Sequence, residues 1–136
     1  STVMRRLLHD LALYDTLHER ILEGMPVFGT CAGLILLAKQ VDGGVPCFAT
    51  MDIAVKRNAY GRQLGSFFTN DSFEGLGTLP MTFIRAPYIE SVSGSAKPLA
   101  VVGEKIVAAQ QDNQLVTAFH PELDENTAIH EYFLKM

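Results

Sequence analysis

One cysteine of the chain lies in a setting typical of a catalytic nucleophile. The segment Gly29-Thr30-Cys31-Ala32-Gly33 has the form of a nucleophile elbow, in which a strand turns sharply into a helix. Such a turn strains the backbone of its central residue, and glycines two positions before and after leave room for it. The turn also places the sulfur at a helix N-terminus, whose partial positive charge favours the thiolate. We therefore predict that Cys31 is a nucleophile and that the amide of Ala32 stabilises an oxyanion.

A nucleophilic cysteine needs a general base, and the base needs a group that orients it. The chain has four histidines, and His120 differs from the other three, which lie in segments with helical periodicity. His120 follows the apolar strand candidate 115–119 and precedes Pro121, so it lies at the carboxyl end of a strand. Open α/β sheets place their sites at such ends. Glu122, two residues further on, is close enough to accept a hydrogen bond from the imidazole.

Each motif also has a purely structural interpretation. A cysteine flanked by glycines is often a core residue, and His-Pro-Glu alone is compatible with a turn that ends a strand. The two motifs together favour catalysis, because one supplies a nucleophile and the other supplies a base with a group that orients it. We therefore predict a triad of Cys31, His120 and Glu122.

The elements that would position this triad are those of an α/β domain. Apolar residues at three- and four-residue spacing predict one helix over 2–23, ending at Gly24. Residues 26–29 read as a short buried strand and 32–39 as a second helix. This strand–turn–helix order is the unit of a parallel sheet.

The rest of the chain predicts short strands and a final helix. The strand candidates are 52–56, 81–85, 99–102, 104–109 and 114–119, with a surface loop over 65–80 and a terminal helix over 126–136. The last two strands would pair around a turn at 112–113. We expect a three-layer α/β fold, with a mostly parallel sheet flanked by helices, in a single domain over 1–136.

Composition excludes several classes of function. The 136 residues are 48% hydrophobic and 19% charged, which is typical of a globular protein. A net charge of −4 gives no electrostatic basis for binding nucleic acid or an anionic membrane. The longest apolar run, 33–38, is far shorter than the roughly 20 residues that span a bilayer. With no signal-peptide pattern and no disulfide framework in its two cysteines, we expect a cytoplasmic protein.

The two motifs resemble those of the class I (triad) glutamine amidotransferases. The likeness rests on Gly29-Thr30-Cys31-Ala32-Gly33-Leu34 and on His120-Pro121-Glu122-Leu123. Arg57-Asn58-Ala59-Tyr60-Gly61-Arg62-Gln63 and Phe83-Ile84-Arg85-Ala86-Pro87 narrow it to the glutaminase subunits of pyridoxal 5′-phosphate synthases. Ser1-Thr2-Val3-Met4-Arg5-Arg6-Leu7 is similar to a segment of the same subunits. The resemblance thus covers the chain from end to end.

The resemblance implies a glutaminase that works with a synthase subunit. Cys31 would attack the side-chain amide of L-glutamine, His120 would shuttle protons, and Glu122 would orient His120. The glutamine-binding positions would be Ser1, Arg57, Ile84 and Arg85. Guanidinium groups suit a substrate carboxylate, which agrees with the two arginines. The glutaminase would need no metal or cofactor, and its ammonia would pass to the synthase subunit in a hetero-oligomer.

The sequence also departs from the family pattern. The family's first strand, its early loop and a Gly-Gly-Glu before Ser1 are absent, so we expect the native domain to extend further at its N-terminus. Tyr88 stands where histidine is usual, and Asp124 where threonine is commoner. Two other interpretations stay open. One is another cysteine amidotransferase or hydrolase on the same scaffold, and the other is a non-catalytic or defective interaction subunit.

Overall fold

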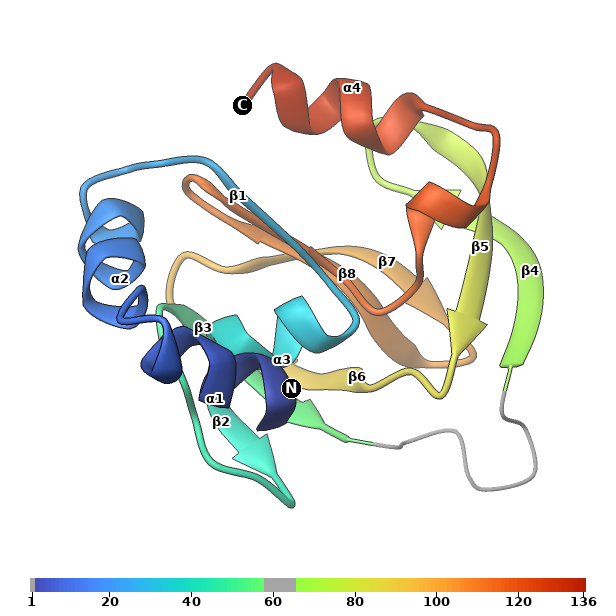
Figure 1. Ribbon diagram of the computed structural model, residues 1–136. Helices are drawn as coiled ribbons and strands as arrows, with labels where there is room; N and C mark the ends of the chain where they lie inside the picture. Colours follow the sequence, from blue (N-terminus) through green and yellow to red (C-terminus); the bar gives the residue numbers. More distant parts are fainter. Residues whose placement is uncertain (1, 58–65) are drawn as a thin grey trace.

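The computed structural model describes residues 2–57 and 66–136, which form one nine-stranded mixed sheet with helices on both faces (Figure 1). The elements are, in chain order, α1 (Thr2–Asp10), α2 (Tyr14–Leu22), β1 (Val27–Thr30), α3 (Ala32–Leu37), β2 (Ala38–Asp42), β3 (Met51–Lys56), β4 (Ser66–Phe73), β5 (Gly77–Ile84), β6 (Tyr88–Val92), β7 (Lys97–Val102), β8 (Lys105–Gln111), β9 (Gln114–Thr117), the 3-10 helix η1 (Pro121–Leu123) and α4 (Ala128–Leu134). Seven strands follow the order β2-β3-β6-β8-β7-β4-β5 within the described part of the chain, and β9 joins β8 to β1.

The parallel part of the sheet contains the predicted strand–turn–helix unit. β1 runs parallel to β9, with Val27 opposite Gln114 and Thr30 opposite Thr117, and β1 leads directly into α3. β2 runs parallel to β3. The helix predicted over 32–39 ends at Leu37, because buried Ala38 begins β2 and pairs with Met51.

The parallel share of the sheet is smaller than predicted. Among the described residues two ladders are parallel, and the remaining six are antiparallel. Short turns connect β4 to β5, β7 to β8 and β8 to β9, and a short turn permits only antiparallel pairing. The last of these is the predicted hairpin around 112–113, where Asp112 has a φ of 52°.

Alternation along β1 shows that α3 and α4 cover opposite faces of the sheet. Successive Cβ positions of a strand point to opposite faces, so the side chain of Phe28 and the Cα hydrogen that replaces a side chain at Gly29 lie on opposite faces of the sheet. A Cβ added to Gly29 would lie 2.7 Å from the carbonyl carbon of Gly33 in α3. The ring of Phe28 lies 5.4 Å from that of Phe133 in α4. The three-layer arrangement expected from the sequence is therefore present around β1.

Residues 66–84 form a hairpin, and the prediction of a surface loop over 65–80 was wrong. β4 and β5 pair without interruption from Ser66–Ile84 to Phe73–Gly77. Gly75 and Gly77 lie at the hairpin turn, and Ser66, Asn70 and Ser72 lie on the exposed face of β4. The other face is mostly apolar and includes stacked Phe67 and Phe83, whose ring centroids lie 4.5 Å apart. Burial of that face stabilises strands that carry many polar residues.

The single helix predicted over 2–23 is broken in two. Ala12 has a φ of 56°, and the chain resumes a helix at Tyr14. The new direction lets Tyr14 stack on Phe48, with ring centroids 5.1 Å apart, and donate a hydrogen bond to the carbonyl of Cys47 at 2.8 Å. Tertiary packing of Tyr14 thus overrides the continuous helical period.

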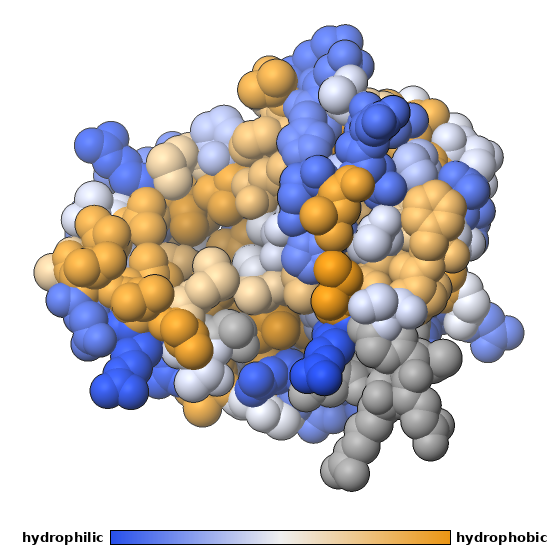
Figure 2. All heavy atoms as spheres, turned by 45° about the vertical axis from the view of Figure 1, so that its right-hand side comes forward, coloured by the Kyte–Doolittle hydropathy of each residue, from blue (hydrophilic) through white to orange (hydrophobic). Residues whose placement is uncertain are grey.

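The first helix contributes apolar surface rather than core. None of the described residues of α1 is buried, and Val3, Met4 and Leu7 are exposed. Figure 2 shows hydrophobic side chains gathered on one side of the molecule, next to a hydrophilic band. No helix among the described residues has the length and apolar character needed to span a lipid bilayer.

The core lies on both faces of the central strands. Its largest fully buried side chains include Phe73, Phe83, Phe119 and Leu115. One buried polar pair ties β9 to the segment before β3. The hydroxyl of Thr50 donates to Oε1 of Gln114 at 2.6 Å, and Nε2 of Gln114 donates to the carbonyl of Thr50 at 3.0 Å. Because each partner satisfies the other, this buried pair fixes β9 against the segment that precedes β3.

Candidate active site

Cys31 occupies the turn between β1 and α3, as the elbow motif predicts. Its backbone has φ 51° and ψ −101°, outside the regions open to residues other than glycine. The amide of Cys31 donates to the carbonyl of Thr117 at 2.8 Å, and the amide of Ile35 bonds to the carbonyl of Cys31 at 3.4 Å. The strained turn is thus held by β9 on one side and by α3 on the other.

The two glycines of the elbow differ in what they accommodate. A Cβ on Gly29 would lie 2.7 Å from the carbonyl carbon and 2.8 Å from the carbonyl oxygen of Gly33. A Cβ on Gly33 would meet no atom within 4 Å in the described part of the chain. The close approach of β1 to α3 therefore requires glycine at position 29 only.

Gly29→Ala is expected to destabilise the fold, because backbone atoms cannot move aside as a flexible side chain can. We expect a loss of about 1–3 kcal/mol or more in the free energy of unfolding, as for other overpacked sites. Gly33→Ala is the matched control, and it should be neutral or slightly stabilising in a helix. Thermal denaturation followed by circular dichroism measures both, and equal melting temperatures for the two variants would contradict the crowding argument.

The environment of Cys31 favours the protonated thiol over the thiolate. Burial raises the pKa of the Cys31 thiol, and the carboxylate of Glu122 raises it further. A hydrogen bond from the backbone amide of Ala32 lowers the pKa; it is a smaller effect than burial and a larger one than Glu122. The amide at the N-terminus of α3 thus favours the thiolate, as expected from the sequence, but burial outweighs its effect on the pKa. A thiol held in this state needs a base to remove its proton before it can attack.

His120 and Glu122 form a close pair at the start of η1. Nδ1 of His120 lies 2.7 Å from Oε2 of Glu122. The side chains are 21% and 50% exposed, respectively, so the imidazole is the more enclosed of the two. A carboxylate only accepts hydrogen bonds, which fixes the Nδ1–H tautomer and leaves Nε2 free to take a proton.

The parallel pairing of β1 with β9 brings the cysteine and the histidine to one edge of the sheet. Thr30 and Thr117 are register partners, and both strands end at these residues. Cys31 follows Thr30 directly, and His120 lies three residues after Thr117. Figure 1 shows the segment after β9 passing beside the turn between β1 and α3. This edge is the position at which open α/β sheets bind their ligands.

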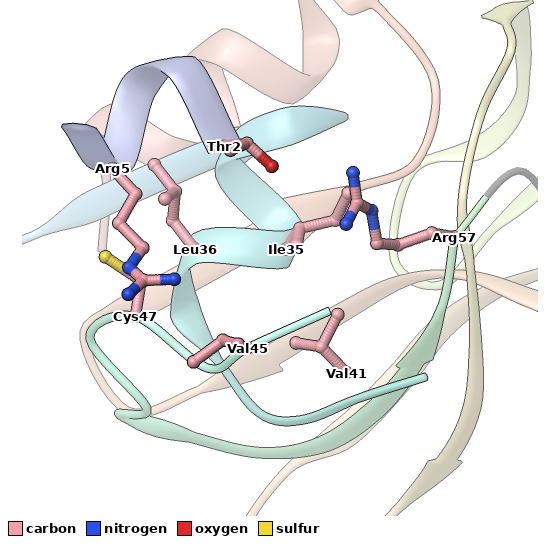
Figure 3. A pocket seen from close by; sticks show the side chains of 8 residues that line it. All are labelled: Thr2, Arg5, Ile35, Leu36, Val41, Val45, Cys47 and Arg57. Atoms are coloured by element: carbon pink, nitrogen blue, oxygen red, sulfur yellow. The ribbon is translucent and has the colours of Figure 1, made fainter. Parts of the chain in front are cut away.

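Arg57 lies at the end of β3 and lines a pocket beside α3. Its Nη1 donates to the carbonyl of Gly43 at 3.1 Å. Figure 3 shows its guanidinium directed toward Ile35 of α3, one helical turn after Cys31. The residues that line this pocket are Thr2, Arg5, Ile35, Leu36, Val41, Val45, Cys47 and Arg57.

Ile84 and Arg85 lie at the end of β5, on the same side as His120. Ile84 is 41% exposed, and Arg85 is exposed with a φ of 45°. Two residues earlier, the carbonyl of Thr82 accepts a hydrogen bond from the amide of His120 at 2.9 Å. Within residues 2–57 and 66–136, no hydrogen bond or ion pair joins Arg57 to Ile84 or Arg85. Ser1 and most of the 57–63 motif lie outside the described residues.

Sequence reasoning missed two residues that contact the catalytic segment. Besides its carbonyl contact, Thr82 donates through Oγ1 to both carboxylate oxygens of Asp124, each at 3.2 Å. In the sequence, Asp124 stands out only as a departure from the family pattern. Thr82 lies one residue before the motif that begins at Phe83. Among the described residues, no group of three or more histidine, cysteine, aspartate or glutamate side chains is arranged to hold a metal ion.

Solved structures share this fold. A crystal structure of a glutamine amidotransferase matches 96% of the chain with a TM-score of 0.90 and 38% sequence identity, over 71% of its own length. A glutamine amidotransferase from Thermotoga maritima matches 79% of the chain with a TM-score of 0.56 and 16% identity, over 45% of its own length. The second likeness concerns the fold alone. The fold is that of the class I glutamine amidotransferases.

Sequence comparison narrows the class. The chain belongs to the SNO glutamine amidotransferase family, whose model matches residues 1–136. The pyridoxal 5′-phosphate synthase subunit PdxT of Methanocorpusculum labreanum is 58% identical over 100% of the chain and 72% of its own length. Those of Haemophilus influenzae and Streptococcus pneumoniae are 54% and 53% identical, over 98% and 100% of the chain and 70% and 71% of their own lengths.

Proposed function

We propose that this chain hydrolyses L-glutamine to L-glutamate and ammonia, and delivers the ammonia to a synthase subunit that makes pyridoxal 5′-phosphate. The family and the names of its relatives support this assignment. The observation that carries the chemistry is the pair of His120 and Glu122, 2.7 Å apart, at the sheet edge where Cys31 forms the elbow. We place the reaction in the cytoplasm and in a single domain.

In the proposed mechanism, Cys31 attacks the side-chain carbonyl carbon of glutamine. Its thiol proton moves to Nε2 of His120, while Glu122 accepts the hydrogen bond from Nδ1 and stabilises the imidazolium. The amide of Ala32 donates to the oxyanion of the tetrahedral intermediate. His120 then returns the proton to the leaving nitrogen, so that ammonia departs and a glutamyl thioester remains. Water, activated by His120, hydrolyses the thioester to glutamate and restores the thiol.

The remaining site residues would recognise the glutamine backbone. Arg57 and Arg85 offer guanidinium groups to the α-carboxylate, a pairing that gives strong, charge-assisted hydrogen bonds. Ile84 would act through its backbone, because its side chain has no polar atom. Ser1 completes the set by resemblance. Together these contacts would distinguish an amino acid substrate from a simple amide.

The test is ammonia release by the protein with and without the synthase subunit. We expect hydrolysis of glutamine but not of asparagine, and a clear rise in turnover when the partner is added. The rise is expected because docking of the partner can select the backbone conformation in which the oxyanion-binding amide donates to the substrate. Cys31→Ala is the inactive control. Equal turnover with and without the partner, in a complex confirmed by sedimentation, would refute activation of the glutaminase by its partner. Absence of glutamine hydrolysis in that complex would favour a non-catalytic subunit.

A further inference from the structure

Thr82 of β5 holds both ends of the segment that carries the histidine and the glutamate. Its carbonyl accepts from the amide of His120 at 2.9 Å, at the start of the segment. Its hydroxyl donates to the Asp124 carboxylate, with both oxygens at 3.2 Å, at the end of the segment. Thr82 and Asp124 are both half-buried, which shields their bond from water.

The segment between these two anchor points is short and internally bonded. The amide of Leu123 donates to the carbonyl of His120, and that of Asp124 to the carbonyl of Pro121, each at 3.2 Å. Pro121 is buried and has a fixed φ. A turn with so little internal freedom is positioned by its ends, so the anchors at Thr82 determine where Glu122 lies.

Neither the ion pair of His120 and Glu122 nor the exposed part of the segment is enough to fix the orientation of the two side chains. The side chain of Glu122 is 50% exposed, and exposed ion pairs contribute little to stability. The next residue, Leu123, is 55% exposed and adds little packing. The orientation of the pair must therefore come from the backbone of the segment rather than from the pair itself.

The hairpin gives Thr82 a rigid base for this task. Thr82 is the register partner of Phe68, and its neighbours Met81 and Phe83 are buried on the opposite face of β5. Burial of both neighbours fixes the strand, so the Thr82 side chain has a defined position. The hydroxyl therefore projects from the exposed face of a strand that is anchored in the core.

We propose that Thr82 and Asp124 are positioning residues, whose hydroxyl–carboxylate bond holds His120 and Glu122 in the geometry for proton transfer. The inference rests on the glutaminase function proposed above. Neither residue contacts the reacting atoms. Loss of the bond is expected to affect the chemical step and to leave glutamine binding unchanged, because proton transfer depends on orientation more steeply than binding does.

The kinetic test replaces the threonine while keeping its shape. In the complex with the synthase subunit, Thr82→Val should lower kcat about tenfold with little change in KM, since a bond to a charged group is lost. Thr82→Ser, which keeps the hydroxyl, should restore most of kcat. Thr78→Val is the matched control. Thr78 is exposed on the same face of β5, and its hydroxyl has no hydrogen bond within the described residues.

Changes at Asp124 complete a double-mutant cycle. Asp124→Asn keeps an acceptor and should be mild, whereas Asp124→Ala should match Thr82→Val. The double variant Thr82→Val/Asp124→Ala should be no worse than either single change, because all three remove the same bond. Additive losses, or an unchanged kcat in Thr82→Val, would overturn the proposal.

A second measurement does not depend on catalysis. The Nδ1 proton of His120, shared with Glu122, should give a downfield proton NMR signal that exchanges slowly with water. Thr82→Val should speed this exchange, and Thr78→Val should not. Identical exchange in both variants would refute the positioning role. Absence of glutaminase activity in the wild-type and Thr78→Val complexes would instead refute the proposed function. The exchange data would still show whether the Thr82–Asp124 bond positions His120.

Discussion

Cys31→Ala is expected to abolish glutamine hydrolysis while leaving the fold intact. The thiol is the nucleophile of the proposed mechanism, and no other group at the elbow can form the glutamyl thioester. Alanine removes only the sulfur, and the hydrogen bond from the Cys31 amide to Thr117 involves the backbone and is retained. The loss should appear in kcat at the limit of detection, with an unchanged melting profile.

Cys47→Ala is the control, and it should retain most of the activity. Burial raises the pKa of the Cys47 thiol as it does that of Cys31, so acidity alone does not separate the two. The difference is the base, since only Cys31 lies at the edge of the sheet that carries His120. A glutamine-mimicking alkylating agent should therefore label Cys31. Mass spectrometry that finds the label on Cys47, with Cys31 unmodified, would sink the assignment.

His120→Asn is expected to lower kcat by about 100- to 10,000-fold, the usual contribution of a positioned proton-transfer group. The raised pKa of the Cys31 thiol adds to the need for a base, because burial disfavours the thiolate. Asparagine keeps much of the shape and the hydrogen-bonding capacity of the side chain but cannot take up the proton. Steady-state kinetics of the complex measures the effect, and wild-type turnover in this variant would refute the triad.

Glu122→Gln should be the milder change at the same site. The amide oxygen of glutamine can still accept from Nδ1, but it lacks the charge that stabilises the imidazolium. Turnover should fall less than in His120→Asn, with a modest change in glutamine affinity, because the group acts on the chemistry. A large rise in KM with unchanged kcat would instead make Glu122 a substrate-binding residue.

The sequence predicted the parts of this protein that local rules determine. The elbow requires a strand, a strained residue and a helix in immediate succession, so the positions of Cys31 and α3 follow from a few neighbouring residues. The hairpin of β8 and β9 likewise follows from a turn at 112–113. His120 could be placed at a strand end because Pro121 disfavours a helical conformation in the residue before it.

The parts that the sequence did not predict depend on contacts between distant residues. No glycine or proline marks the break at Ala12, which is explained by the stacking of Tyr14 on Phe48. The polar residues of 66–80 suggested a loop, but this segment forms strands with one face exposed and the opposite face packed into the core. β2 and β6 pair with β3 from opposite sides, and no local pattern specified either pairing. The contact of Thr82 with Asp124 spans 42 positions in the chain, which explains why sequence motifs missed it.

The strained backbone of Cys31 lowers the stability of the fold at the residue that catalysis requires. A residue other than glycine with φ 51° and ψ −101° destabilises the native state by about 1–3 kcal/mol. That is a sizeable fraction of the roughly 5–15 kcal/mol by which a typical domain is stable. Glycine at position 31 would relieve the strain and remove the nucleophile in the same step. Laboratory evolution for heat resistance alone would therefore drift toward an inert protein, and only a screen that also demands ammonia would keep the thiol.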